Sequence, residues 1–210
     1  MIRLFTACVL LVLTIPVQAS TEIGSVAIYS DGSAEKLLER NSEWSLWQDQ
    51  RKRLFKKANY PHFPTIHYQK FPDKREGYRQ ELVYGSPEQI KPMGEKQSLN
   101  YELLKTSKSS RGKKYWKCSY TGKGKFKLGT KKYRTHNYEC VRSIFNKHMS
   151  LLKKEQLNLK YSPTLEMVVD RKRVDSKGKK ERVKLLKILK PKKATAKNIA
   201  RAIYKIRNEK

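Results

Sequence analysis

Cysteine is scarce in this sequence: three residues in 210, which excludes a disulfide-dense small protein. Acidic residues are also few, 19 against 48 Lys and Arg, so that the formal net charge is +29. Hydrophobic residues make up 38% of the chain and charged residues 32%, which excludes a membrane-spanning bundle and a coiled coil. The remaining possibilities are one domain or two small ones.

The first 19 residues have the pattern of a secretory signal peptide. Arg3 gives a short positive start, an apolar run extends from Leu4 to Pro16, and small residues stand at Val17 and Ala19. The apolar run is shorter than the roughly 20 residues that span a bilayer, although an uncleaved anchor stays open as an alternative. We therefore expect an exported protein, in a bacterial periplasm or outside the cell, without a transmembrane segment in the mature chain.

Cleavage after Ala19 leaves two cysteines, Cys118 and Cys140. In an oxidising compartment such a pair predicts one disulfide, and closing a loop of about 20 residues would stabilise the fold by roughly 3 kcal/mol. The same cysteines with His136 and His148 could bind zinc, but their spacing lacks the short paired gaps of structural zinc sites. We expect neither a metal site nor a cofactor.

The positive charge lies almost entirely in the second half of the chain. Residues 20–100 carry 13 basic and 11 acidic side chains, whereas residues 101–210 carry 34 and 8. This contrast suggests a near-neutral N-terminal region (20–100) with a helix, an aromatic loop and a strand, followed by a basic α+β region (101–210). The two regions could also form a single domain. An asymmetry of this kind indicates the type of partner rather than the fold.

Hydrophobic periodicity predicts an α+β fold: a mostly antiparallel sheet with three helices, one disulfide and long polar loops. Helices are expected over residues 34–58 and 139–156, and from Thr195 toward the C-terminus. Strands are expected at 77–84, 114–120 and 132–138, and a hairpin at 164–174 and 180–189. Residues 59–72 are expected to form the aromatic loop.

Basic residues alternate with aromatic ones in the second half, as in Lys114-Tyr115-Trp116-Lys117 and Lys125-Phe126-Lys127. This pattern is typical of surfaces that bind anionic polymers, although rings in the core and lysines in water would give the same alternation. The leading hypothesis is an exported cationic protein that binds nucleic acid, lipopolysaccharide or an acidic envelope polysaccharide. The candidate binding residues form one patch of Lys113, Lys114, Lys117, Lys123, Lys125, Lys131, Lys132 and Arg134, and a second of Arg171, Lys172 and Arg173.

Two alternatives belong to other classes of protein. The first is a small secreted hydrolase, a nuclease or a cell-wall polysaccharide-cleaving enzyme, with His136 as its acid or base and Glu139 as the accompanying carboxylate. The second is a cationic subunit or inhibitor that docks on an acidic envelope protein. The sequence alone identifies neither a reaction nor an oligomeric state.

Overall fold

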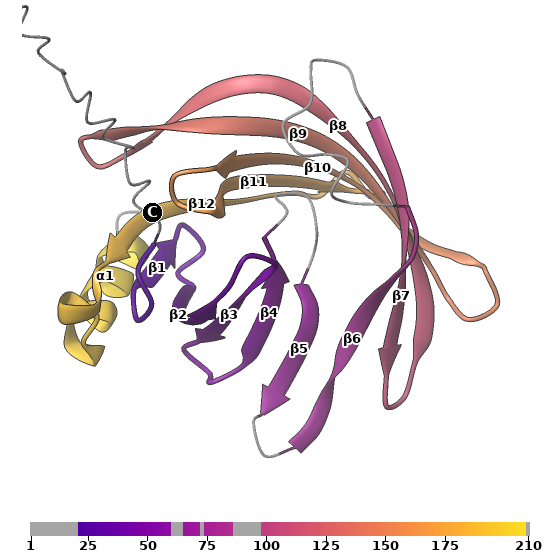
Figure 1. Cartoon of the computed structure of the whole chain (residues 1–210), viewed down its shortest axis with the longest axis horizontal. Helices are drawn as coiled ribbons and strands as arrows, with labels where there is room; N and C mark the ends of the chain where they lie inside the picture. Colours follow the sequence, from indigo (N-terminus) through magenta and orange to yellow (C-terminus); the bar gives the residue numbers. More distant parts are fainter. Residues whose placement is uncertain (1–20, 60–64, 72–73, 86–97, 209–210) are drawn as a thin grey trace, which may run out of the picture.

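The structure, a computed structural model, describes residues 21–59, 65–71, 74–85 and 98–208; the expected signal peptide lies outside these ranges. Twelve antiparallel strands within them form a closed barrel, in which each strand pairs with the next along the chain and β1 pairs with β12 (Figure 1). Strands from residues 20–100 and from 101–210 therefore build the same barrel. The strands are β1 Val26–Tyr29, β2 Ala34–Arg40, β3 Trp44–Asp49, β4 Leu54–Ala58, β5 Thr65–Phe71, β6 Lys74–Tyr84, β7 Ser98–Ser107, β8 Arg111–Leu128, β9 Lys131–Phe145, β10 Leu151–Ser162, β11 Met167–Asp175 and β12 Lys180–Leu189.

The predicted α+β fold with three helices and long polar loops is wrong. Residues 34–58 form the strands β2, β3 and β4, and residues 139–156 form the end of β9 and the start of β10. The hairpin predicted around Asp175 is present as β11 and β12. Part of the predicted aromatic loop is strand β5, and its residues 60–64 and 72 lie outside the described ranges.

Two tight turns explain why the two expected helices do not form. The side-chain Oδ1 of Asp49 accepts backbone N–H bonds from residues 51 and 53, both at 2.9 Å. In the same way, Oδ1 of Asn146 accepts N–H bonds from residues 148 and 150, at 2.9 and 3.0 Å. An Asp or Asn side chain that bonds the backbone two and four residues on reverses the chain and competes with helix.

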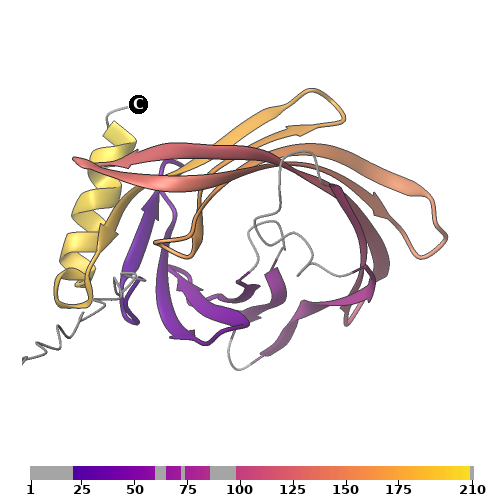
Figure 2. The same cartoon turned by 45° about the horizontal axis from the view of Figure 1, so that its top comes forward.

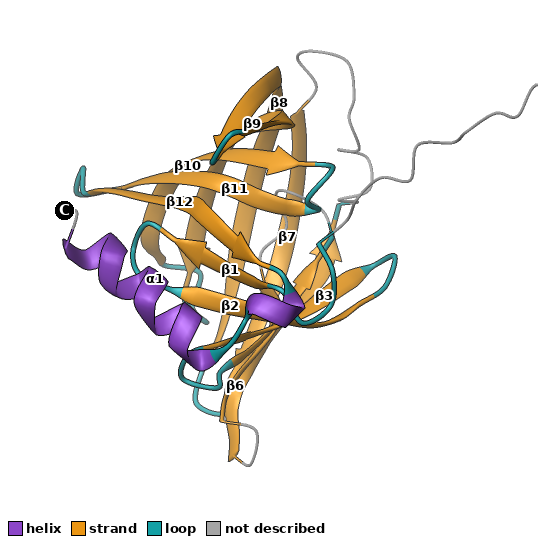
Figure 3. Ribbon diagram, turned by 90° about the vertical axis from the view of Figure 1, so that its left-hand side faces the viewer, coloured by secondary structure: helices purple, strands orange, loops and turns teal. Residues whose placement is uncertain are grey.

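The single helix in the described part of the chain is α1, Ala196–Asn208, and it confirms the third predicted helix. Thr195 caps it, since Thr195 Oγ1 accepts the backbone N–H of Asn198 at 3.3 Å. The helix lies against the outside of β1 and β2 (Figure 3). Its apolar side, the one predicted from the sequence, packs on a cluster from β1, β2 and β12 and consists of Ile199, Ala202, Ile203 and Ile206.

Among the residues described, no helix has the length and apolar character that crossing a membrane by a helix requires.

The predicted disulfide is confirmed. Cys118 on β8 lies directly opposite Cys140 on β9, with an S–S distance of 2.09 Å and both residues buried. The bridge belongs to a buried cluster in which Tyr101 stacks on Trp116 with ring centroids 5.8 Å apart. It therefore joins the two longest strands of the barrel inside one hydrophobic core.

Candidate functional site

The hairpin of β8 and β9 reaches beyond the barrel wall. β8 has 18 residues and β9 has 15, and their shared end lies as a second layer over the outer side of β10, β11 and β12 (Figures 1 and 2). A register shift between Tyr120 and Gly122 separates this end from the part of β8 that lines the barrel. Such bulges bend a strand and re-aim its side chains.

One face of the hairpin end is anchored to the barrel. Phe126 is 4% exposed and belongs to the same buried cluster as Met167, Val169 and Leu185 of β11 and β12. Nζ of Lys184 on β12 lies 5.7 Å from the centroid of the Phe126 ring. Because this face is buried, the alternate residues of both strands are held on the opposite, outward face.

That outward face carries a ladder of cations. In the β8–β9 register, Lys123 lies opposite His136, Lys125 opposite Arg134, and Lys127 opposite Lys132. We call these six residues the basic ladder; its five Lys and Arg side chains are all exposed. Within the described ranges none of the five forms an ion pair with a carboxylate. The chain has twelve basic residues and no acidic one between Glu102 and Glu139.

The other residues of the first predicted patch are dispersed. Lys131 lies at the hairpin turn beside the ladder and is exposed. Lys114 lines the barrel interior, so its neighbour Lys113 and the exposed Lys117 lie on the outer face of β8. Lys113 is paired with Glu102 at 2.8 Å. The structure thus brings together the residues of that patch that lie on the hairpin end. Lys113, Lys114 and Lys117, which lie nearer the start of β8, are not part of this group.

The second predicted patch is divided between two sides of the barrel wall. Arg171 lines the interior cavity, and Arg173 follows it on the same face of β11 and bonds Glu155 at 3.4 Å. Lys172 lies on the outer face and is exposed. These three residues therefore do not form one surface.

The structure does not bring His136 and Glu139 together. The two residues are three positions apart on β9 and face opposite sides of it. The His136 ring lies edge-on to Tyr120 at 5.9 Å between centroids, and partial burial, with the positive charge of Lys123, lowers the pKa of His136. Glu139 is exposed opposite Ser119 and Asn158. Their arrangement is not that of an acid–base pair.

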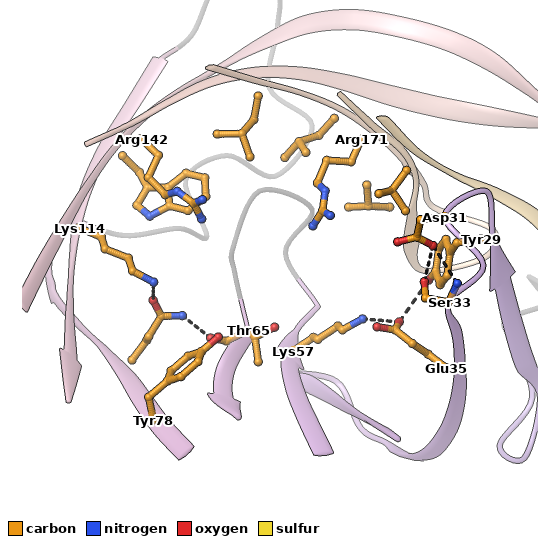
Figure 4. A pocket seen from close by; sticks show the side chains of 16 residues that line it. Tyr29, Asp31, Ser33, Glu35, Lys57, Thr65, Tyr78, Lys114, Arg142 and Arg171 are labelled. Atoms are coloured by element: carbon orange, nitrogen blue, oxygen red, sulfur yellow. Dashed lines mark hydrogen bonds and ion pairs between the residues drawn. The ribbon is translucent and has the colours of Figure 1, made fainter. Parts of the chain in front are cut away.

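The barrel also encloses a cavity of about 410 Å³, which no pattern in the sequence predicted (Figure 4). Two of its carboxylates are already bonded within the protein. Lys57 Nζ contacts Glu35 Oε2 at 2.6 Å, and Asp31 Oδ1 accepts the hydroxyl of Ser33 at 2.6 Å. The lining residues come from ten of the twelve strands and from the β1–β2 connection: Tyr29, Asp31, Ser33, Glu35, Lys57, Thr65, Tyr78, Gln80, Lys114, Trp116, Arg142, Leu157, Leu159, Val168, Arg171 and Val183.

Cations approach the cavity from β8 and β9. Lys114 donates to the side-chain carbonyl of Gln80, whose amide in turn donates to the backbone carbonyl of Thr65. Burial, together with the neighbouring charges of Arg142 and Lys105, lowers the pKa of Lys114 to about 8. The interior of the barrel is thus a polar chamber rather than a fully apolar core.

No family model and no curated protein matches this chain. Solved structures resemble it weakly, at 10% identity: the hypothetical lipoprotein YmcC of Escherichia coli K12 (TM-score 0.47; 78% of this chain and 82% of that chain), a protein named as a lipoprotein from Parabacteroides distasonis (0.43; 82% and 98%), and a protein named as exported with a YmcC-like fold from Bacteroides fragilis (0.46; 81% and 98%). These likenesses define neither a family nor a function for the chain.

Proposed function

We propose that this protein is exported and binds an anionic polymer through the basic ladder of the β8–β9 hairpin. The observation that carries the proposal is the direct register of cation against cation on two successive rungs of the exposed face, Lys125 opposite Arg134 and Lys127 opposite Lys132, with Lys123 as the cation of the third rung. Like charges directly opposite each other in a sheet are destabilising. A bound polyanion would relieve that repulsion and release its own counterions on binding.

The length of the ladder favours a polymer over a small anion. Alternate residues of a strand recur about every 6.8 Å, so that the three rungs extend over roughly 14 Å. A single carboxylate or phosphate can contact one rung, whereas a chain of repeating anionic groups can contact all three at once. The burial of Phe126 and Thr135 on the opposite face holds the rungs in place before binding.

Export is supported by the signal pattern in the first 19 residues and by the disulfide. Disulfides persist in oxidising compartments such as the periplasm and the extracellular space, where envelope polyanions are found. The identity of the polymer, whether nucleic acid, lipopolysaccharide or an acidic envelope polysaccharide, is a question for competition between these ligands.

The test compares two double variants of equal charge. Lys125→Gln/Lys132→Gln removes two ladder cations, and Lys177→Gln/Lys179→Gln removes two exposed cations from the β11–β12 turn. Affinity for heparin and for single-stranded DNA is measured between 50 and 300 mM salt with the mature chain. The logarithm of the binding constant falls as the logarithm of the salt concentration rises. We expect the ladder variant to make this negative slope shallower by about 1.5, and the turn variant to leave the slope near the wild-type value.

Equal losses in the two variants would show that only net charge matters and would overturn the proposal. Wild-type binding that does not change with salt would do the same.

A further inference from the structure

The cavity inside the barrel has an apolar wall on one side. Leu157 and Leu159 of β10, Val168 of β11 and Val183 of β12 supply it, and they line the same cavity as Arg142 and Arg171 (Figure 4). A volume of about 410 Å³ lies within the range of roughly 300–1,000 Å³ that small-molecule sites occupy. An apolar wall combined with a few polar groups is the usual composition of such a site.

Positive charge exceeds negative charge beside this wall. Glu155, 1% exposed, accepts from Arg142 Nε at 2.7 Å, from Lys153 at 2.7 Å and from Arg173 at 3.4 Å. Arg173 and Arg171 also share Glu181. Four cations are thus grouped around two carboxylates, and two of the four, Arg142 and Arg171, line the cavity.

Two further groups of the lining have no carboxylate bonded to them in the part of the chain that the structure describes. Among the described residues, Lys114 donates its hydrogen bond to the uncharged side chain of Gln80. The indole Nε1 of Trp116 is buried and has no hydrogen-bond partner among the described residues, while the guanidinium of Arg142 lies 5.1 Å from the centroid of the same ring. A buried donor without an acceptor is unfavourable, so a ligand oxygen in its reach would stabilise the site.

We propose that the cavity binds a small amphiphile with one anionic head, a carboxylate or a phosphate, and an apolar body. The head is held by Lys114, Arg142 and Arg171, and the apolar body lies against the wall formed by Leu157, Leu159, Val168 and Val183. Lys114 provides the main positive charge that binds the anionic head, because its hydrogen bond within the protein is to the neutral side-chain amide of Gln80. This site is separate from the basic ladder, which lies on the outer face of the hairpin.

The test uses the mature protein with its disulfide intact and isothermal titration below the concentration at which the probes form micelles. Dodecanoate and dodecyl phosphate distinguish a carboxylate head from a phosphate head, dodecan-1-ol lacks the charge, and acetate and inorganic phosphate lack the apolar body. We expect one of the two charged amphiphiles to bind at least tenfold more tightly than all three incomplete probes. Equal binding of dodecan-1-ol would overturn the proposal.

Variants locate the site. Lys114→Met keeps the length of the side chain and is expected to weaken binding of the preferred amphiphile at least tenfold, whereas Lys117→Met, three residues along the same strand and on its outer face, leaves it unchanged. Arg171→Met, at a partly exposed position with 47% of its side chain accessible, tests the same head group should Lys114→Met fail to fold. Full affinity in both cavity variants would contradict the assignment.

The outcome is independent of polyanion binding. Lys125→Gln/Lys132→Gln is expected to bind the amphiphile as the wild type does, and Lys114→Met is expected to keep the heparin affinity of the wild type.

Discussion

Lys125 and Arg134 lie directly opposite each other on the exposed face of the β8–β9 hairpin. Cross-strand neighbours are the closest side chains in a sheet, and two positive charges in this position repel. The hairpin nevertheless keeps this register because its other face buries Phe126 and Thr135 against the barrel. Stability in this part of the protein therefore comes from the covered face, and the exposed face remains available to an anion.

Reversing one charge of this pair should separate stability from binding. Lys125→Glu replaces the repulsion with Arg134 by an attraction, so we expect the free energy of unfolding to rise by about 0.2–1 kcal/mol. The same change places a negative charge on the proposed binding face, so we expect weaker heparin affinity. Urea denaturation and heparin elution at increasing salt measure the two effects.

Lys177→Glu at the exposed β11–β12 turn is the control, because it changes net charge equally without a ladder partner. If Lys125→Glu proved less stable than the wild type, or bound heparin as tightly, the role assigned to this rung would be wrong.

Three hairpin turns of the barrel have the same construction. They begin at Asp49, Asn146 and Asp175, and in each the first side chain accepts the backbone N–H groups two and four residues on. The fourth residue has positive φ in every case: 60° at Lys52, 61° at Met149 and 75° at Gly178. Only the third turn has glycine where the backbone is left-handed, which is the conformation that glycine adopts most easily.

Exchanging residue types between these equivalent positions should change stability in opposite directions. Met149→Gly is expected to raise the free energy of unfolding by about 0.5–1 kcal/mol, because Met149 is 48% exposed and gives up little packing. Gly178→Met is expected to lower it by about 1 kcal/mol, although no atom lies within 4 Å of the new Cβ. Thermal or urea unfolding of the two single variants measures this, and changes of the same sign would contradict the shared turn geometry.

The same three turns explain which strands could be predicted. Asp175 with Gly178 is a recognisable turn signal, and the hairpin around it was predicted correctly. Lys52 and Met149 carry no such signal, so the segments around Asp49 and Asn146 were interpreted as continuous helices. Apolar residues spaced by three or four also fit a strand that changes register at a bulge, and β2 has such a shift between Leu37 and Glu39.

Of the two candidate sites, only the basic ladder on the outside of the barrel could be predicted from the sequence. The charge excess and the interleaved rings pointed to the hairpin residues, and the strand register of the structure places them on one face. The cavity could not be found in this way, because Lys114, Arg142 and Arg171 become neighbours only when the barrel closes. In the sequence these residues look like the other solvated cations, and Arg142 lay within a segment expected to be a helix.

The disulfide should account for a substantial part of the stability. It closes a loop of 22 residues, for which the chain-entropy model gives about 3 kcal/mol. We expect a reducing agent to lower the free energy of unfolding of the wild type by roughly that amount in urea denaturation. The double variant Cys118→Ala/Cys140→Ala should be insensitive to the reducing agent, and a comparable loss in that variant would assign the effect to something other than the bridge.

Lys114 should make stability depend on alkaline pH. Its pKa is lowered to about 8, first by burial and then by Arg142 and Lys105; the nearby Glu155 opposes this shift, and the ring of Tyr78 lies 5.6 Å from Nζ. Between pH 8 and about 10.5 the unfolded chain therefore holds a proton that the folded protein has released. By linkage, this group makes the free energy of unfolding rise with pH in that window, by at most about 1.4 kcal/mol per pH unit.

Lys114→Met removes this contribution, so the difference in stability between variant and wild type should change steadily from pH 7.5 to pH 9.5 in favour of the wild type. Lys117→Met, which removes an exposed lysine from the outer face of the same strand, is the matched control and should show a nearly constant difference. Parallel pH profiles for wild type and Lys114→Met would mean that the amine is hydrated in the folded protein. In that case it could not provide the buried positive charge on which binding of an anionic head in the cavity depends. A difference that shifts toward the wild type as the pH rises would instead show that the barrel holds the Lys114 amine at a desolvated position, where a ligand anion would restore its charge.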